Sequence, residues 1–155
     1  MGENGQALLL MIDIRPMAAT EEAAVRRLFA DCHPAIPTRP PGWYVVYPTI
    51  VALLDGTVVG FTSFSVSPNP NGLLTLYGND LCVAETVRRR GIGQELATAR
   101  ATLARAVGAT CFIGVAERDN APMRRIFARQ GAHPCQVLRG YWQGRDAEVW
   151  TGLLS

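Results

Sequence analysis

The sequence predicts a single α/β domain with a mixed, mostly antiparallel central sheet of about six to seven strands flanked by helices. Two observations support this fold class. Residues 50–83 are rich in β-forming residues and contain a hairpin signal at Asp55-Gly56, as in an antiparallel meander. Apolar residues then recur at helical spacing over 92–107, and the nearly all-apolar run 110–116 is typical of a buried parallel strand.

The N-terminal third predicts a strand, a helix and a long loop. The chain of 155 residues suits one domain, with residues 1–7 expected as a flexible tail. The apolar run Leu8–Ile14 predicts the first strand, and Thr20 is expected to cap the helix that follows. Residues 33–48 contain five prolines and predict a long irregular loop, a kind of segment that is often functional.

The C-terminal third predicts one more helix and two more strands. The helix is expected from near Asn120 to Gly131, because apolar residues follow at helical spacing and glycine commonly ends helices. The β-rich segments 136–139 and 149–153 are expected to complete the sheet.

The composition excludes several classes of protein. All 15 basic residues are Arg, so Schiff-base enzymes and Walker-type phosphate loops, which need Lys, are excluded. The net charge of +2 does not favour a nucleic-acid partner, and no apolar run is long enough to span a membrane. The four cysteines are far apart and form no C-x-x-C pair, which is typical of reduced thiols, so we expect a cytoplasmic protein.

One segment between a predicted strand and a predicted helix points to anion binding. It reads Arg88-Arg89-Arg90-Gly91-Ile92-Gly93. Glycines at such a turn leave backbone N–H groups accessible at the helix N-terminus, and Arg side chains match phosphate oxygens. A dinucleotide site is the first alternative, but it requires G-x-G-x-x-G, and Leu96 stands at its third glycine. The other alternative is a tight turn with solvated charges.

Three segments together resemble the GNAT superfamily of acyl-CoA-dependent N-acyltransferases. They are Arg88-x-x-Gly91-x-Gly93, the strand end Asn79–Val83, and Asn120-Ala121-Pro122 followed by Phe127 and Gln130–Ala132. The order of elements also matches, so the resemblance covers nearly the whole chain. Within the superfamily, the sequence looks most like diamine and small-amine acetyltransferases. It departs from them at Asn79, where that group often has Glu, and at Phe127, where most members have a Tyr that protonates the CoA thiolate.

The resemblance implies a GNAT fold, splayed between its fourth and fifth strands, with acetyl-CoA as cosubstrate and no metal. The pantetheine arm would lie in the gap and bond to the backbone of the fourth strand. The cofactor-binding residues that it implies are Leu81, Cys82, Val83, Arg88, Arg89, Arg90, Gly91, Ile92, Gly93, Gln94, Asn120 and Phe127. A zinc site built from Cys32-His33 and His133-x-Cys135 is not expected, since their spacing does not bring them together.

Three residues are candidates for proton transfer. Asp80 is the first candidate for the base that deprotonates the amine, with a strand-edge carboxylate that pairs with an Arg as the alternative interpretation. Glu117 is the second candidate base. Tyr141, or water, would replace the missing acid at Phe127.

The predicted function is transfer of an acetyl group from acetyl-CoA to a primary amine, either a small amine or an amino-terminal group. Two alternatives stay open: a catalytically idle acyl-CoA-binding module, and an acyltransferase that acts on a protein partner. The expected partners are acetyl-CoA and the amine acceptor, without nucleic acid or membrane, and a homodimer is an allowed oligomeric state.

Overall fold

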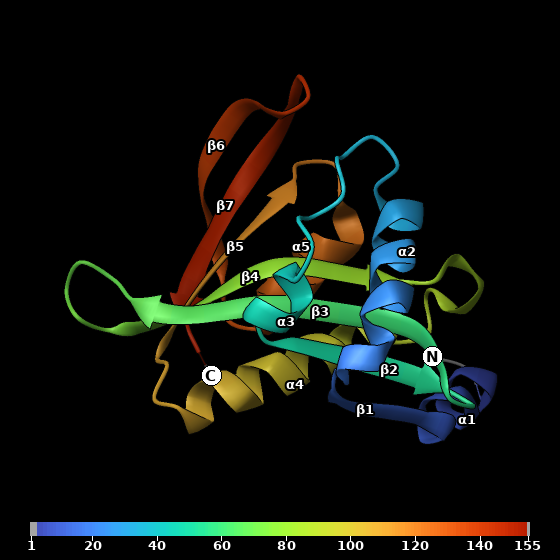
Figure 1. The fold of residues 1–155 in the computed structure, drawn as a ribbon. Helices are drawn as coiled ribbons and strands as arrows, with labels where there is room; N and C mark the ends of the chain where they lie inside the picture. Colours follow the sequence, from blue (N-terminus) through green and yellow to red (C-terminus); the bar gives the residue numbers. More distant parts are fainter. Residues whose placement is uncertain (1–2, 155) are drawn as a thin grey trace. The chain divides into compact units, whose positions relative to one another are not determined.

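The computed structural model describes residues 3–154. The elements along the chain are α1 (Glu3–Met11), β1 (Ile12–Pro16), the 3-10 helix η1 (Ala19–Glu21), α2 (Glu22–Cys32), α3 (Trp43–Val46), β2 (Thr49–Leu54), β3 (Thr57–Pro68), β4 (Leu74–Val83), the 3-10 helix η2 (Glu85–Val87), α4 (Ile92–Ala106), β5 (Cys111–Glu117), α5 (Ala121–Arg129), β6 (His133–Trp142) and β7 (Arg145–Leu153) (Figure 1).

The strands form one seven-stranded sheet in the order β1-β2-β3-β4-β5-β7-β6. The pairs β1–β2, β2–β3, β5–β7 and β6–β7 are antiparallel, whereas β4 and β5 are parallel. The parallel ladder joins Thr75–Gly78 to Cys111–Gly114, although β4 continues to Val83 and β5 to Glu117. The predicted fold class, a mixed and mostly antiparallel sheet with helices, is therefore confirmed.

Contacts divide the chain into two compact units, which are described separately. The first unit comprises the chain up to Phe64 together with Asp80–Arg100. The second comprises Ser65–Asn79 and the chain from Ala101 onward.

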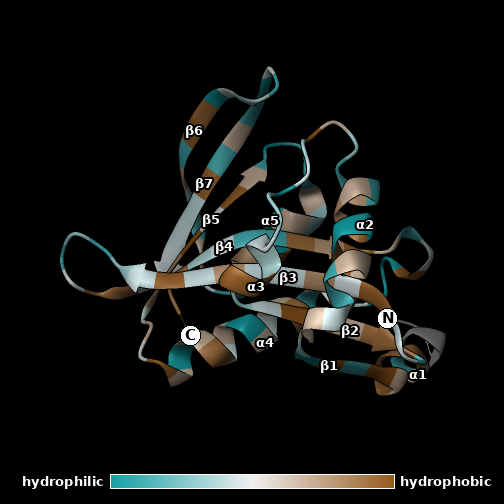
Figure 2. Cartoon of the chain, viewed as in Figure 1, coloured by the Kyte–Doolittle hydropathy of each residue, from teal (hydrophilic) through white to brown (hydrophobic). Residues whose placement is uncertain are grey.

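The core of the first unit forms where the apolar stripe of α2 meets the sheet. Val25, Leu28 and Phe29 are buried at helical spacing and pack in one cluster with buried residues of α3, β2, β3 and β4. β2 is buried along almost its whole length, and Figure 2 colours most of it as hydrophobic. The predicted hairpin between β2 and β3 is confirmed, because Asp55 and Gly56 both adopt the positive φ angles of a tight turn, 50° and 76°.

The core of the second unit is aromatic. The ring of Phe127 on α5 lies 5.3 Å from the Phe112 ring of β5 and 5.9 Å from the Trp150 ring of β7, measured between centroids. All three side chains are buried. Gly114, between them on β5, has no side chain and so leaves room for the Phe127 ring.

The N-terminal elements differ from the prediction. Leu8–Met11 belong to α1 and not to a strand, because Gln, Ala, Leu and Met are strong helix formers and no β-branched residue occurs before Ile12. Of the expected tail 1–7, residues 3–7 lie in α1, and residues 1–2 lie outside the described part of the chain.

Thr20 does not cap a helix, because it lies inside η1. The carboxylate of Glu21 takes the capping role. It accepts a hydrogen bond from the Ala18 N–H at 2.7 Å and a bidentate pair from the Arg15 guanidinium at 2.8 Å. This hydrogen bonding from Arg15 lowers the pKa of Glu21.

The last two strands are longer than predicted. β6 and β7 extend to a turn at Gln143-Gly144, where both residues have positive φ angles, 50° and 84°. The helices α4 and α5 and the strand β5 agree with their predicted ranges to within one or two residues.

Filling the space at Gly114 should destabilise the second unit. A Cβ there would lie 2.6 Å from Cζ of Phe127 and 2.7 Å from Cζ of Phe112. We expect Gly114→Ala to lower the free energy of unfolding by about 1–3 kcal/mol in urea denaturation. Phe127→Leu removes the nearest ring atoms, so the double variant should lose less than the sum of the two single losses. Strict additivity would contradict the packing described here.

Candidate active site

The turn before α4 leaves backbone N–H groups at the start of the helix without helical partners. Arg89 and Gly91 have positive φ angles, 63° and 87°, and the Glu95 N–H donates to the Gly91 carbonyl at 3.1 Å. The helical ladder therefore begins at Gly91, and the N–H groups of Ile92, Gly93 and Gln94 lack the carbonyl partner that a preceding turn would supply. Glycine has no side chain to cap them, and Ile92 anchors the turn because its side chain is buried. Such a turn suits a phosphate.

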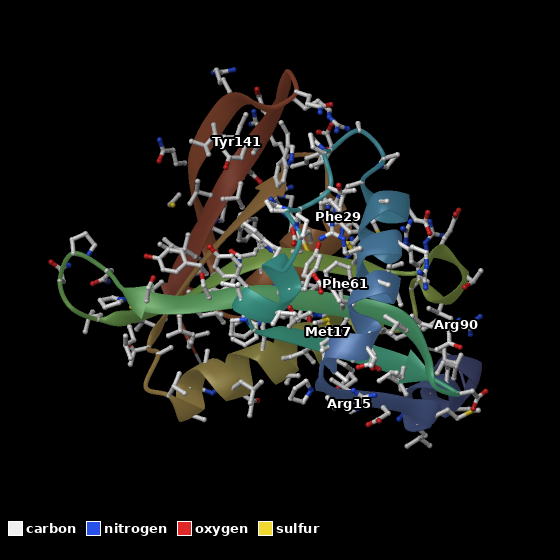
Figure 3. All side chains as sticks on the ribbon, viewed as in Figure 1. Arg15, Met17, Phe29, Phe61, Arg90 and Tyr141 are labelled. Atoms are coloured by element: carbon white, nitrogen blue, oxygen red, sulfur yellow. The ribbon has the colours of Figure 1, made fainter. Side chains whose placement is uncertain are left out.

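The three arginines of this turn differ in their surroundings. Arg88 turns back onto the end of β4: its Nε donates to the Val83 carbonyl at 2.9 Å, and its Nη2 to the Cys32 sulfur at 3.7 Å. Arg89 is exposed and Arg90 is half-buried on the loop before α4 (Figure 3). Arg89 and Arg90 therefore add positive charge to the turn, while Arg88 also holds the strand end.

The end of β4 has two different backbone edges. The Ala84 N–H donates to the Val59 carbonyl of β3 at 2.7 Å, and the Asp80 carbonyl accepts from the Thr62 hydroxyl of β3 at 2.8 Å. Because backbone groups alternate in direction along a strand, the N–H and C=O groups of Cys82 also point toward β3. Those of Leu81 and Val83 point to the opposite edge. Of the three strand residues predicted to bond a cofactor arm, Leu81 and Val83 have suitably directed backbone groups, and Cys82 has its backbone toward β3.

Asp80 is a buried carboxylate of the first unit that accepts three side-chain hydrogen bonds. Its side chain is only 4% exposed. Oδ1 accepts from Nη2 of Arg39 at 2.7 Å, and Oδ2 accepts from the Ser63 hydroxyl at 3.1 Å and the Tyr44 hydroxyl at 3.5 Å. Asp80 therefore pairs with an Arg, as the alternative interpretation of this residue expected.

The long loop after α2 reaches β4 through Arg39. The guanidinium carbon lies 4.9 Å from the centroid of the Trp43 ring and 5.3 Å from that of Phe29. Both contacts are at cation–π distance. The ion pair with Asp80 and the two rings together fix this loop, residues 33–42, against the core of the first unit.

The groups around Asp80 keep their protons. Burial, followed by the charge of Asp80, raises the pKa of Tyr44, so its hydroxyl stays a hydrogen-bond donor. Burial lowers the pKa of Arg39, but the hydrogen bond to Asp80 and its charge outweigh this effect, and the net shift is upward. The carboxylate therefore lies among a permanent cation and two neutral donors.

Phe127 points at the end of the parallel ladder between β4 and β5. Its Cζ is the atom nearest to the space that a Cβ on Gly114 would fill, and Gly114 pairs with Gly78 in the last register pair of that ladder. A hydroxyl at this ring position would lie beside the glycine backbone. The side chain is 2% exposed, so it offers an apolar surface and no proton.

The remaining predicted residues of the second unit have partners of their own. Glu117, at the end of β5, is half-buried and pairs with Arg145 at 3.0 Å. The Asn120 Oδ1 accepts from the Met123 N–H at 3.1 Å and so caps α5. Tyr141 is 59% exposed on β6 and contacts the Trp142 ring (Figure 3). It follows Pro134, the register partner of Trp150, by seven residues, roughly 20 Å of extended strand.

Sequence reasoning missed two groups of buried polar residues. Arg39, Tyr44 and Ser63 surround Asp80, but they come from three separate segments without a recognisable pattern. Glu148 on β7 is buried in the second unit and pairs with Arg124 of α5 at 2.9 Å. The only local signal for Glu148 is a carboxylate in an apolar strand.

Two features are absent from the part of the chain that the structure describes. No helix within 3–154 is both long and apolar enough to cross a membrane. Over the same residues, no group of three or more His, Cys, Asp or Glu side chains is arranged to hold a metal ion.

Solved structures of other proteins have folds similar to this one. A chain of the NatC complex, solved with bound Gag peptide and CoA, matches with 19% identity, a TM-score of 0.79, and coverage of 93% of this chain and 99% of that one. A ribosomal-protein-alanine N-acetyltransferase from Brucella melitensis matches with 20% identity, a TM-score of 0.77, and coverage of 92% and 99%. The Arabidopsis thaliana protein NAA60, solved with acetyl-CoA, matches with 16% identity, a TM-score of 0.77, and coverage of 92% and 99%.

These structural similarities, at such low identities, establish the fold. No curated protein sequence matches the chain. The family model described as "Acetyltransferase (GNAT) family" matches residues 15–132, which include the turn before α4, Asp80 and Phe127. The chain therefore belongs to the GNAT acetyltransferase family, whose members are acyl-CoA-dependent N-acyltransferases.

Proposed function

We propose that this protein transfers an acetyl group from acetyl-CoA to the amino terminus of a polypeptide by direct attack of the amine. The observation that carries the proposal is the turn before α4. Its left-handed Gly91 and three backbone N–H groups without helical partners form a phosphate site in the first unit. Structures with similar folds, such as NAA60 with acetyl-CoA, support the same cosubstrate.

The residues present fit acetyl-CoA. The N–H groups of Ile92, Gly93 and Gln94, with Arg89 and Arg90, would hold the pyrophosphate. The outward backbone groups of Leu81 and the N–H of Val83 would bond the pantetheine arm as an added strand, since the Val83 carbonyl accepts from Arg88. Asn120 and Phe127, which belong to the second unit, are the further contacts to the arm that the family resemblance implies. Acetyl-CoA supplies a thioester, which is an activated acyl donor.

Asp80 is the proposed base. A protonated amine must lose a proton before or during attack. A carboxylate offers about four lone-pair directions, and Asp80 uses three for Arg39, Ser63 and Tyr44. One direction remains for a water molecule that relays the proton. Glu117 is the second candidate, although it pairs with Arg145.

Water is the proposed proton donor to the departing thiolate. Phe127 has no hydroxyl. Tyr141 is exposed, and it lies seven residues along β6 from Pro134, which pairs with the Trp150 that contacts Phe127. A thiol ionises far more readily than an amine, so the thiolate leaves without a strong acid. The enzyme is then active without the Tyr that most family members have at this position.

The charges around Asp80 favour an amino-terminal acceptor over a diamine. A diamine carries a second cation that an unpaired carboxylate would bind. Asp80 is already paired with Arg39, and Asn79 is neutral where small-amine acetyltransferases often have Glu. Structures with similar folds include NatC with a bound Gag peptide, which supports the same choice.

The free thiols support a cytoplasmic location, which is part of the proposal. Cys32, Cys82, Cys111 and Cys135 are all free. Secreted proteins of this size more often pair their cysteines.

The acceptor class can be tested by thiol release from acetyl-CoA. We expect release with short peptides that have free amino termini, and little with putrescine or spermidine. The same peptides with blocked amino termini are the matched control. Release with diamines alone would contradict the acceptor class, and no release with any amine would favour a catalytically idle acyl-CoA-binding module.

Gly91→Val should abolish CoA binding in calorimetry. A β-branched side chain cannot easily adopt the φ of 87° at this position, and it would block the approach of phosphate to the backbone. Gly72→Val is the matched control, because Gly72 has a similar φ of 79° in an open turn of the second unit. Equal CoA affinity in wild type and Gly91→Val would remove this turn from the site.

Two variants that both break the Asp80–Arg39 ion pair show whether Asp80 acts as a base or only holds the loop in place. If Asp80 is the base, Asp80→Asn should lower turnover by roughly a hundredfold or more. Arg39→Gln keeps the carboxylate and should retain most of the turnover. CoA affinity should barely change in either variant. Equal losses in the two variants would show that the ion pair matters only for the fold of the loop.

A further inference from the structure

Two cysteine thiols meet at the end of β4 in the first unit. Cys32 is the last residue of α2 and is half-buried, whereas Cys82 on β4 is 2% exposed. Both thiols are free. Cys32 packs against the buried cluster that contains Cys82. The acetyl transfer proposed above uses neither thiol.

Arg88 places a positive charge beside the more accessible thiol. Its Nη2 lies 3.7 Å from the Cys32 sulfur, and its Nε is fixed by the Val83 carbonyl at 2.9 Å. The same carbonyl lies 3.8 Å from the Cys32 sulfur. The guanidinium is therefore held by the backbone in a position that favours a thiolate on Cys32.

The two thiols are made unequal by these contacts. The hydrogen bond from Cys82, and then the Arg88 guanidinium, lower the pKa of Cys32 to about 7, although partial burial opposes this shift. The hydrogen bond with Cys32 and burial raise the pKa of Cys82. At neutral pH, Cys32 is the nucleophilic thiol and Cys82 is the neutral thiol that faces it.

We propose that Cys32 is a site of reversible oxidation by a peroxide, with Cys82 as the resolving thiol. In the first step the Cys32 thiolate attacks the peroxide. An S–O bond forms, the O–O bond breaks, and with one proton the leaving oxygen becomes water or an alcohol, so that Cys32 becomes a sulfenic acid. In the second step the Cys82 sulfur attacks the Cys32 sulfur. The S–S bond forms, the S–O bond breaks, and water leaves. The two thiols lose two electrons, which the peroxide gains.

The other two cysteines of the chain have different neighbours. The Cys111 sulfur lies 3.8 Å from the Thr110 hydroxyl, and the Cys135 sulfur lies 3.4 Å from the Val149 carbonyl. A hydroxyl and a carbonyl stabilise a thiolate less than a guanidinium does. Cys135 is more exposed than Cys32, so accessibility alone would favour Cys135. The order in which peroxide oxidises the cysteines therefore distinguishes this proposal from oxidation that simply follows solvent exposure.

The oxidation is tested with the full chain and stoichiometric hydrogen peroxide at pH 7. We expect loss of two free thiols per chain and a Cys32–Cys82 disulfide, both reversed by dithiothreitol. Trypsin leaves both cysteines on one peptide, because the bond after Arg39 precedes Pro40, so chymotrypsin is the better choice for mapping. Oxidation of Cys111 or Cys135 before Cys32, or no disulfide, would overturn the proposal.

Matched variants separate the roles of the two thiols. Cys82→Ser should stop the reaction at the sulfenic acid of Cys32, which dimedone traps, and Cys32→Ser should give neither product. The pH profile of Cys32 alkylation by iodoacetamide should have a midpoint near pH 7 in wild type. Cys82→Ser keeps a hydrogen-bond donor and should leave this midpoint low, while Cys82→Ala and, less strongly, Arg88→Gln should raise it.

One outcome of these profiles would contradict the assignment. If the midpoint lies near the ordinary thiol value of about 8.5 in wild type and in all the variants, Cys32 is not activated by its neighbours. These readouts require neither acetyl-CoA nor an amine. They stand or fall independently of the proposed acetyl transfer.

Discussion

The buried carboxylate of Asp80 organises the first unit. A charge out of water is costly unless partners surround it, and Asp80 has partners from three separate segments. Arg39 comes from the proline-containing loop, Tyr44 from α3 and Ser63 from β3. Removing any one of them leaves the buried carboxylate with fewer hydrogen bonds. The loop, α3 and β3 therefore all contribute to stabilising the buried charge on β4. These contacts fix the loop against β4.

The end of β4 combines structural and functional roles within a few residues. The Asp80 carbonyl and the Ala84 N–H bond to β3, while Leu81 and Val83 direct their backbone groups the other way. Arg88 then uses its guanidinium on the Val83 carbonyl and the Cys32 sulfur. Three residues after Arg88, the left-handed Gly91 opens the N-terminus of α4. One strand edge, one cation and one helix end thus follow one another within a single stretch of chain, residues 81–92.

Sequence patterns predicted the parts of the fold that local chemistry decides. The Asp55-Gly56 hairpin, the helix α4 and the strand β5 have strong periodicity or unambiguous turn residues. α1 was missed because the short apolar run from Leu8 to Ile14 was read as one buried strand, and periodicity alone does not separate such a strand from a helix. The tight turn before α4 was predicted because Gly91 has a local conformational role. The Arg39–Asp80 pair, 41 residues apart, could not be found, because no local pattern marks two residues that meet only in the folded chain.

The cations in these ion pairs are all guanidinium groups. Each of the pairs described here, such as Arg39–Asp80, Arg124–Glu148 and Arg145–Glu117, uses Arg, and the chain contains no Lys. A guanidinium stays protonated at any physiological pH and is therefore a very poor nucleophile toward a thioester. A protein that handles activated acetyl groups has in this way no side-chain amine to be acetylated by its own cosubstrate. Acetyl-CoA therefore does not neutralise the cations of these ion pairs by acetylating them.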